Sequence, residues 1–236
     1  TGQATVNLYD VVDITGTINF GGPTVPITIT TPGQNARFTF VGSAGQRASV
    51  NGTSSFSTCW SLGIFKSDGT ALANTFSCGS GIMIEPQTLP EAGTYTVVVD
   101  PSGAGLGSAS VTLYDVTDVT GPITVNGPAV NVTLNTPGQN ARLTFDGTAG
   151  QRISANGAST FSSCWSLGIY KPDGTQLANI FTCGSNAFIE AQTLPVTGTY
   201  TLVADPSGAG TGGATLNVYE VTDVTGTITP GGASVP

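Results

Sequence analysis

The octapeptide YDVTDVTG at residues 114–121 decides how this chain is organised. Close copies occur as YDVVDITG at residues 9–16 and as YEVTDVTG at residues 219–226, so the offset is 105 residues both times. Self-similarity at a fixed period is the signature of a repeat architecture. The sequence therefore predicts a 105-residue repeat in which this octapeptide joins the end of one unit to the start of the next.

The segments between the octapeptides obey the same offset. Residues 31–37 (TPGQNAR) recur at 136–142, and the pair Cys59-Trp60 recurs as Cys164-Trp165, without insertion or deletion. Each unit is long enough to enclose a core of its own. The predicted organisation is the last strand of a preceding repeat at 1–13, β-sandwich repeats at 14–118 and 119–223, and the first strand of a following repeat at 224–236.

Short runs of alternating apolar residues predict that each unit is all-β. Such runs include Val25, Ile27 and Ile29 in one segment and Tyr95 and Val97 in another; this period of two is typical of half-buried strands. Turn signals such as Pro-Gly, Asp-Gly and Pro-Ser-Gly separate the runs. We expect seven to nine strands in each unit, folded as a β-sandwich or jelly roll, and no helix.

The composition limits where the protein works and what it binds. Only 8% of the residues are charged, the formal net charge is −8, and Lys and Arg together number six. So few cations disfavour nucleic acid and anionic membranes as partners. No apolar stretch approaches the roughly 20 residues that a membrane span requires. A surface covered by Thr, Ser, Asn, Gln and Gly suits a protein that is secreted or held at the cell surface.

Each unit contains two cysteines that flank one predicted hairpin. Their even number and wide spacing, in a chain without His, favour disulfides over a metal site or a redox motif. We therefore predict an oxidising environment and the two disulfides Cys59–Cys78 and Cys164–Cys183.

The turn of this hairpin differs between the two units. In the first, a two-residue type I′ turn at Asp68-Gly69 would set Cys59 opposite Cys78. In the second, Pro172 favours a type I turn with a glycine bulge, which requires a further bulge before Cys183.

The absence of His removes several kinds of active site. Ser-His-Asp and Cys-His arrangements and HExxH zinc sites all need an imidazole. Many of the carboxylates stand in turn motifs, where Asp accepts hydrogen bonds from nearby backbone N–H groups; these are Asp68, Asp100, Asp173 and Asp205. We therefore predict that the chain is not an enzyme and carries no organic cofactor.

The acids of the repeated octapeptide are the candidate metal ligands. They form the pairs Asp10 and Asp13, Asp115 and Asp118, and Glu220 and Asp223. Ca²⁺ held by such a pair between neighbouring units would stiffen the array, although Ca²⁺ takes six to eight oxygen ligands. The alternative is that these acids are solvated or form ion pairs with the repeated arginines, which are Arg37, Arg47, Arg142 and Arg152.

The aromatic residues divide between the core and the surface. Trp60 shares a strand face with Leu62 and Ile64, which predicts that it is a core residue and not a sugar-stacking platform. Phe65 and its counterpart Tyr170 point the other way. We expect these two side chains to contact either a neighbouring unit or a ligand.

Three runs of the first unit carry a family resemblance. They are ARFTFVGSAGQRASV at residues 36–50, CWSLGIFKSDGTALA at 59–73 and TLPEAGTYTVVVDPSGAGLGSASVTLYD at 88–115. They resemble the FxF strand, AGQ turn, PDGT-type hairpin and GTYTVxV strand of bacterial pre-peptidase C-terminal domains. The resemblance implies jelly-roll β-sandwiches of secreted proteases and large surface proteins, which act as spacers or as binders of matrix and carbohydrate.

Two hypotheses of function follow. The first is a structural repeat of an extracellular fibre, sheath or surface stalk, because near-identical units follow one another without a flexible Gly/Ser linker. Its partners would be neighbouring repeats and other copies of itself, through edge strands or outer aromatic residues. The second is a carbohydrate- or matrix-binding adhesion module in which repetition provides avidity. A solvent-open groove lined by Phe65 and Tyr170 would favour the second.

Overall fold

The computed structural model describes residues 2–227 and 229–231, and in these residues all regular secondary structure is β. The first unit contains β1 (Ile14–Thr17), β2 (Val25–Ile29), β3 (Ala36–Gly42), β4 (Arg47–Ser54), β5 (Trp60–Phe65), β6 (Ala71–Ser77), β7 (Gly81–Thr88), β8 (Gly93–Pro101) and β9 (Gly107–Asp115). The second contains β10 (Val119–Pro122), β11 (Val130–Leu134), β12 (Ala141–Gly147), β13 (Arg152–Ser159), β14 (Trp165–Tyr170), β15 (Gln176–Thr182), β16 (Asn186–Thr193), β17 (Gly198–Pro206) and β18 (Gly212–Glu220). No helix capable of crossing a membrane is found in the described part of the chain.

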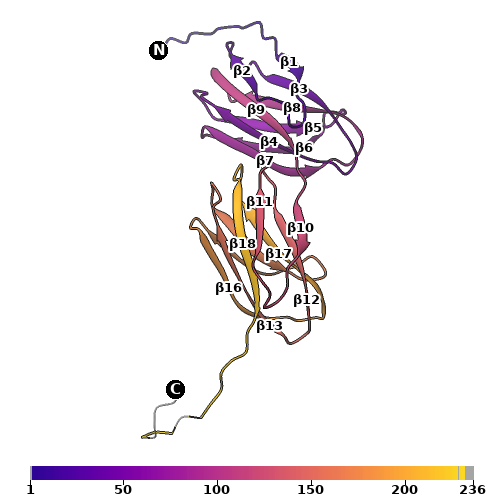
Figure 1. Cartoon of the computed structure of the whole chain (residues 1–236). Coiled ribbons are helices and arrows are strands. Elements are labelled where there is room, and N and C mark those ends of the chain that lie inside the picture. Colours follow the sequence, from indigo (N-terminus) through magenta and orange to yellow (C-terminus); the bar gives the residue numbers. More distant parts are fainter. Residues whose placement is uncertain (1, 228, 232–236) are drawn as a thin grey trace.

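Each unit is a sandwich of two sheets (Figure 1). In the first unit, a five-stranded sheet of order β1-β3-β8-β5-β6 faces a four-stranded sheet of order β2-β9-β4-β7, and the second unit repeats this arrangement with β10 to β18. The first strand of each unit pairs in parallel with the third, whereas the remaining strand pairs are antiparallel. The chain is therefore two β-sandwiches, as the alternating pattern predicts.

Alternation along each strand builds two separate cores. In β3, Ala36, Phe38 and Phe40 are buried while the residues between them are exposed. Trp60 is 1% exposed, and its indole N–H donates to the carbonyl oxygen of Gly79 at 3.1 Å. Trp165 occupies the same position in the second core and is also 1% exposed. The prediction that the tryptophans are core residues is confirmed, because the buried N–H of the indole has a partner.

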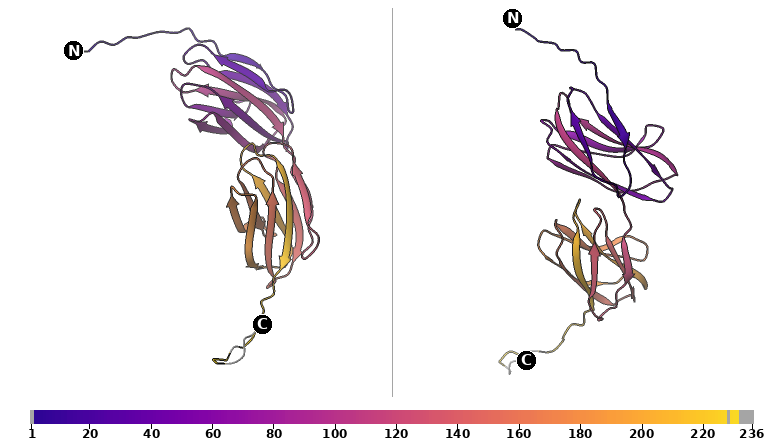
Figure 2. Two further views of the ribbon diagram at one scale, coloured as in Figure 1. Left: turned by 60° about the vertical axis from the view of Figure 1, so that its left-hand side comes forward. Right: turned by 45° about the horizontal axis from the view of Figure 1, so that its top comes forward.

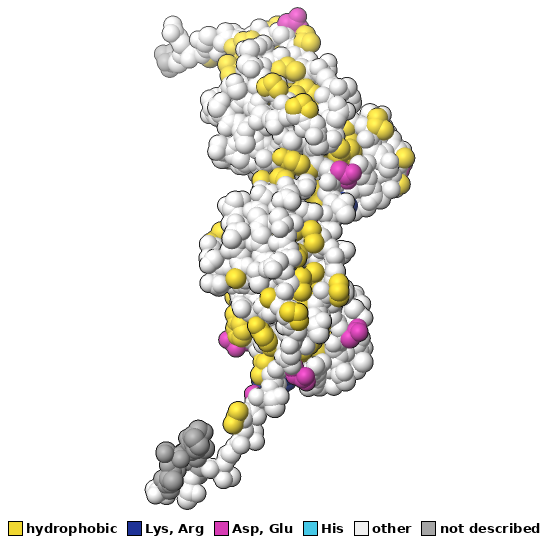
Figure 3. All heavy atoms as spheres, in the orientation of Figure 1, with side chains coloured by type: hydrophobic (Ala, Val, Ile, Leu, Met, Phe, Trp, Pro, Cys, Tyr) yellow, Lys and Arg dark blue, Asp and Glu magenta, His cyan; other side chains and the backbone are white. Residues whose placement is uncertain are grey.

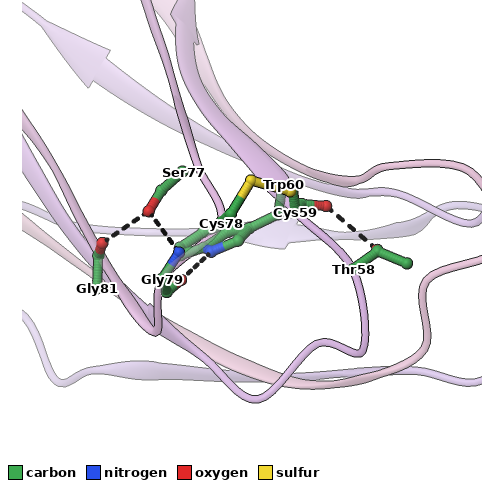
Figure 4. Close-up of a disulfide and its surroundings, with 7 residues drawn as sticks. All are labelled: Thr58, Cys59, Trp60, Ser77, Cys78, Gly79 and Gly81. Atoms are coloured by element: carbon green, nitrogen blue, oxygen red, sulfur yellow. Dashed lines mark hydrogen bonds between the residues drawn. A yellow bond between two sulfur atoms is a disulfide. The ribbon is translucent and has the colours of Figure 1, made fainter.

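Both predicted disulfides are present, Cys59–Cys78 and Cys164–Cys183. Figure 4 shows the first of them beside Trp60 and the polar loop that follows Cys78. The backbone N–H of Ser102 donates to the carbonyl oxygen of Cys59 at 2.8 Å, so the bridged hairpin is also tied to the end of β8. With a sequence separation of 19 between its cysteines, each bridge stabilises its unit by about 3 kcal/mol in the chain-entropy model.

The hairpin turn has the same form in both units, and the type I′ prediction for the first is wrong. A type I′ turn needs positive φ at both central residues. Among the described residues, Asn126 is the one non-glycine with positive φ, so Asp68 does not meet this requirement. Instead, Gly69 N–H donates to the carbonyl oxygen of Lys66 and Gly69 has a φ of 82°, which is a type I turn followed by a glycine bulge.

The additional bulge that the second hairpin requires lies beside its turn. The register of β14 and β15 shifts between Ile169 and Tyr170, and Trp165 then pairs with Thr182. The first hairpin shows the same shift between Ile64 and Phe65. The bulge beside the turn compensates the register shift that the glycine bulge introduces. The cysteines therefore face each other although the turn is not type I′.

The chain outside the two sandwiches contains no strand in its described residues. Residues 4–9 match β9 in sequence, but β9 lies between β2 and β4, and residues 4–9 have no such neighbours. The same applies to residues 224–227, which match β1 and have no strand like β3 beside them. That residues 1–13 and 224–236 belong to neighbouring repeats stays a prediction; Thr1, Ile228 and residues 232–236 lie outside the described residues.

Candidate functional sites at the junction and on the outer sheet face

The two units lie end to end and meet at a short junction (Figures 1 and 2). Only Val116, Thr117 and Asp118 lie between β9 and β10. The backbone N–H of Val116 donates to the carbonyl oxygen of Arg47 at 2.9 Å, and that of Val119 donates to a carbonyl of the second unit at 2.8 Å. The connection is therefore bonded to the first unit at its start and to the second at its end, which restricts its motion.

The loop between β11 and β12 packs against the end of the first unit. The hydroxyl group of Ser49, a fully buried residue of β4, donates to the carbonyl oxygen of Pro137 at 3.2 Å. Gly138 is so close to β7 that a Cβ atom on it would lie 2.8 Å from Cγ of Pro86 and 3.1 Å from Cε of Met83. Contact of this kind leaves no room for a side chain at Gly138.

The repeat provides its own comparison between covered and uncovered positions. Val116 at the junction is 2% exposed, whereas its counterpart Val11, which has no preceding unit beside it, is 39% exposed. Gly138 is buried, whereas its counterpart Gly33 is exposed. The junction thus covers surface that is open on the outer end of the first unit.

Arginines pair with the second acid of each octapeptide. Asp118 accepts from Arg47 of the first unit at 2.8 Å and from the backbone N–H of Asn140 of the second at 3.2 Å, so it bridges the two units. Asp13 accepts from the backbone N–H of Asn35, the counterpart of Asn140, but its arginine is Arg37, the counterpart of Arg142; both partners belong to the first unit.

The arginine and a backbone N–H bond lower the pKa of Asp13. Asp223 pairs with Arg152, and this bond lowers the pKa of Asp223 and raises that of Arg152.

The first acids of the octapeptides do not join these ion pairs. Asp115 accepts from the side-chain amide of Gln46 at 2.9 Å. Across the described residues, no group of three or more His, Cys, Asp or Glu residues is placed to hold a metal ion. The ion pairs agree with the alternative given above, and the calcium site at Asp10, Asp13, Asp115, Asp118, Glu220 and Asp223 stays a prediction.

A second group of acids meets inside the junction, and the sequence did not indicate it. A cavity of about 530 Å³ lies between the units, and Glu85 and Arg47 line it from the first unit while Asp205, Asn140 and Phe181 line it from the second. In the orientation that satisfies its polar atoms, the Asn140 amide donates to Oδ1 of Asp205 at 2.8 Å. Asp205 therefore faces the junction, although its sequence motif indicated a turn residue like Asp68.

Both carboxyl groups of this cavity are perturbed in the same direction. Burial raises the pKa of Glu85, the negative charge of Asp205 adds to the effect, and a hydrogen bond from the backbone of Gly208 opposes it. Burial also raises the pKa of Asp205, with a further contribution from Asp118 and an opposing one from Arg142. The closed junction thus disfavours the ionised form of both groups.

The outer face of the five-stranded sheet in the first unit is hollowed. The hollow has a volume of about 1010 Å³ and extends from β1 to the turn between β5 and β6; its lining includes Phe65, Arg37, Asn74 and Asp100. Phe65 is half-buried, and a Cβ atom on Gly63 would lie 2.5 Å from Cε2 of its ring. The glycine therefore allows the ring to lie against the sheet.

The second unit does not reproduce this hollow. Beside β10, β12 and β17 it carries two smaller hollows, of about 480 Å³ and about 430 Å³. Asn179 and Asp205, the counterparts of Asn74 and Asp100, line the junction cavity instead. Tyr170 lines none of these three, although it packs on Gly168 as Phe65 packs on Gly63. The structure thus places Phe65 and Tyr170 on equivalent faces of separate units, and Phe65 lines the hollow of about 1010 Å³.

Comparisons with known proteins give partial likenesses. No family model and no curated protein matches the chain. Among solved structures, the pre-peptidase C-terminal domain of a collagenase from Bacillus anthracis is 15% identical, with a TM-score of 0.36, over 43% of this chain and 96% of that one. A periplasmic inhibitor of g-type lysozyme from Aeromonas hydrophila is 13% identical, with a TM-score of 0.32, over 44% and 100%. The PBSX exported protein XepA is 10% identical, with a TM-score of 0.26, over 82% and 86%.

Proposed function

We propose that the two units are structural repeats of an extracellular fibre, sheath or surface stalk, joined end to end by stiff junctions. The observation that carries this proposal is the junction itself. It covers positions such as Val116 and Gly138, while the same positions, Val11 and Gly33, are uncovered at the outer end. A further copy of the repeat is the occupant whose surface matches that end.

The path of the chain supports a linear array. The described ends of the chain lie at opposite ends of the molecule, so successive units extend the array instead of folding back (Figure 1). The connection of Val116, Thr117 and Asp118 is too short to act as a flexible linker, and Asp118 bonds to both units. Such a repeat has the properties of a spacer whose stiffness comes from contacts between nearest neighbours.

The surface and the disulfides support an extracellular setting. Figure 3 shows few charged side chains and mainly polar neutral surface on the face that it presents. A disulfide in each unit suits an oxidising compartment, where it persists and stabilises the unit against unfolding.

Negative-stain imaging of the native protein tests this function. Stiff rods or regular filaments are the expected result. A matched variant with six Gly and Ser residues inserted after Thr117 should give bent, variable particles. Dispersed particles with freely varying angles in the unmodified protein would contradict the proposal.

The hollow lined by Phe65 favours a second function, the binding of a neutral carbohydrate. The Phe65 ring packs on the sheet at Gly63 and can stack on the C–H groups of a sugar, and the hydroxyl, amide and guanidinium groups around it can bond to sugar hydroxyls. Two cations of the hollow are already paired, Arg37 with Asp13 and Lys66 with Asp68, which disfavours anionic ligands.

Affinity electrophoresis in gels that contain xylan, mannan or hydroxyethylcellulose tests this second function, with alginate as the anionic comparison. Retardation by a neutral polymer should be lost in Phe65→Ala and kept in Tyr170→Ala. Equal retardation of both variants, or none with any neutral polymer, would refute it.

A further inference from the structure

The junction cavity places two carboxyl groups from different units opposite each other. Glu85 stands near the end of β7 in the first unit, and Asp205 stands near the end of β17 in the second. They line the same cavity, and each unit supplies one acid. Opening the junction would therefore separate the two carboxyl groups and expose Asp205, which is half-buried, more fully to water.

The charged groups around this pair do not balance it. Arg47 lines the cavity but is bonded to Asp118 at 2.8 Å, and Arg142 is the other cation that acts on Asp205. Asp118 adds a third negative charge beside Asp205. Hydrogen bonds from Gly208 to Glu85 and from Asn140 to Asp205 satisfy the carboxyl groups only in part. With all three acids ionised, three negative charges face two positive ones.

We propose that this pair makes the stiffness of the junction depend on pH, so that the array is stiffer at acidic pH and loosens as the pH rises. This inference rests on the proposed function, since it concerns regulation of the same junction. A proton bound to either Glu85 or Asp205 removes the repulsion between them and provides a donor in the cavity.

The sign follows from proton linkage. Closing the junction raises the pKa of both acids above their ordinary values of 4.5 for Glu and 3.8 for Asp, so the closed form binds protons more tightly than the open form. Its extra stability is fully present below the ordinary values and is lost as the pH rises through the raised ones. For Asp205, the more buried of the two, each unit of raised pKa changes the ratio of closed to open junctions by up to about tenfold; the effect of the exposed Glu85 is smaller because solvent screens it.

The repeat suggests that every junction carries such a pair. The counterpart of Asp205, which is half-buried, is Asp100, which is exposed on the outer end of the first unit. The counterpart of Glu85 is Glu190 on β16; both glutamates are exposed, but Glu85 shares a cavity with an acid of the other unit. Neither counterpart faces a partner acid across a described junction. They are therefore matched controls within the same molecule.

Distance measurements between spin labels on the two units test the inference from about pH 4 to pH 8, because ordinary carboxyl groups are ionised over most of this range. The distance distribution should broaden as the pH rises. Glu85→Gln should weaken the pH dependence, and Glu85→Gln combined with Asp205→Asn should give a narrow distribution at every pH, whereas the control Glu190→Gln should behave as the unmodified chain does.

A narrow distribution at every pH in the unmodified chain would overturn the pH dependence and leave the structural function standing. A broad distribution at every pH would overturn both. Unchanged pH dependence in Glu85→Gln would show that another group is responsible and would also overturn the inference.

Discussion

Replacing Gly138 by alanine should loosen the junction without unfolding either unit. Gly138 has a φ of 84°, and a Cβ atom there would meet Pro86 at 2.8 Å and Met83 at 3.1 Å. Its counterpart Gly33 has almost the same φ, 83°, but a Cβ atom there would meet only Val11, at 3.9 Å. The two substitutions therefore share the backbone strain and differ in the contact with a neighbouring unit.

Backbone strain and the contact with Pro86 affect different properties of the protein. The left-handed backbone conformation costs an alanine roughly 1–2 kcal/mol, and both variants should lose this much stability in their own unit. Gly138→Ala also forces an extra carbon against Pro86, which costs roughly 1–3 kcal/mol as overpacking. The junction can relieve that second cost by opening, so it should appear as lost stiffness and not as a lower unfolding midpoint.

Urea unfolding and small-angle X-ray scattering test this reasoning together. Both variants should show similar destabilisation, but only Gly138→Ala should show the scattering of a flexible pair of units. Scattering of Gly138→Ala that matches Gly33→Ala would refute the idea that contact at Gly138 holds the junction.

Two further predictions concern the disulfides and Asp118. Replacing both Cys59 and Cys78 by serine should lower the free energy of unfolding of the first unit by about 3 kcal/mol, measured by urea unfolding; an unchanged midpoint would contradict the stabilising role of the bridge. Asp118→Asn should widen the range of angles between the two units, because it removes the charge that binds Arg47. Small-angle X-ray scattering measures this change. EDTA should leave the scattering of the unmodified chain unchanged if the ion pair alone holds Asp118, whereas loosening by EDTA would support Ca²⁺ at the junction acids.

Much of the fold could be predicted because it depends on patterns that local sequence carries. The strict alternation of apolar and polar residues marks the core face of β3. Trp60 shares a strand face with Leu62 and Ile64, which places it in the core. The turn at Asp68-Gly69 was mispredicted because the two turn types place a glycine with positive φ at different points, and composition alone does not separate them. A compensating bulge restored the register, so the disulfide was predicted correctly despite the wrong turn.

The candidate sites were only partly predictable because they depend on how one unit meets another. The octapeptide indicated Asp118 as a junction acid, but whether it pairs with an arginine of its own unit or of the preceding one is decided by the packing. Glu85 was missed because it lies far from the octapeptide in sequence and nothing around it differs from an ordinary surface strand. The loss of the groove at Tyr170 likewise depends on the three-dimensional arrangement of the second unit.

Double electron–electron resonance between spin labels at Ala44 and Ala149 tests the central claim most directly. These two residues are exposed counterparts in the two units, so one label reports on each. At mildly acidic pH, a stiff junction predicts one narrow distance distribution, and it should broaden when a Gly/Ser segment is inserted after Thr117. A broad distribution in the unmodified chain, no narrower than that of the insertion variant, would contradict the account of these units as repeats of a stiff array.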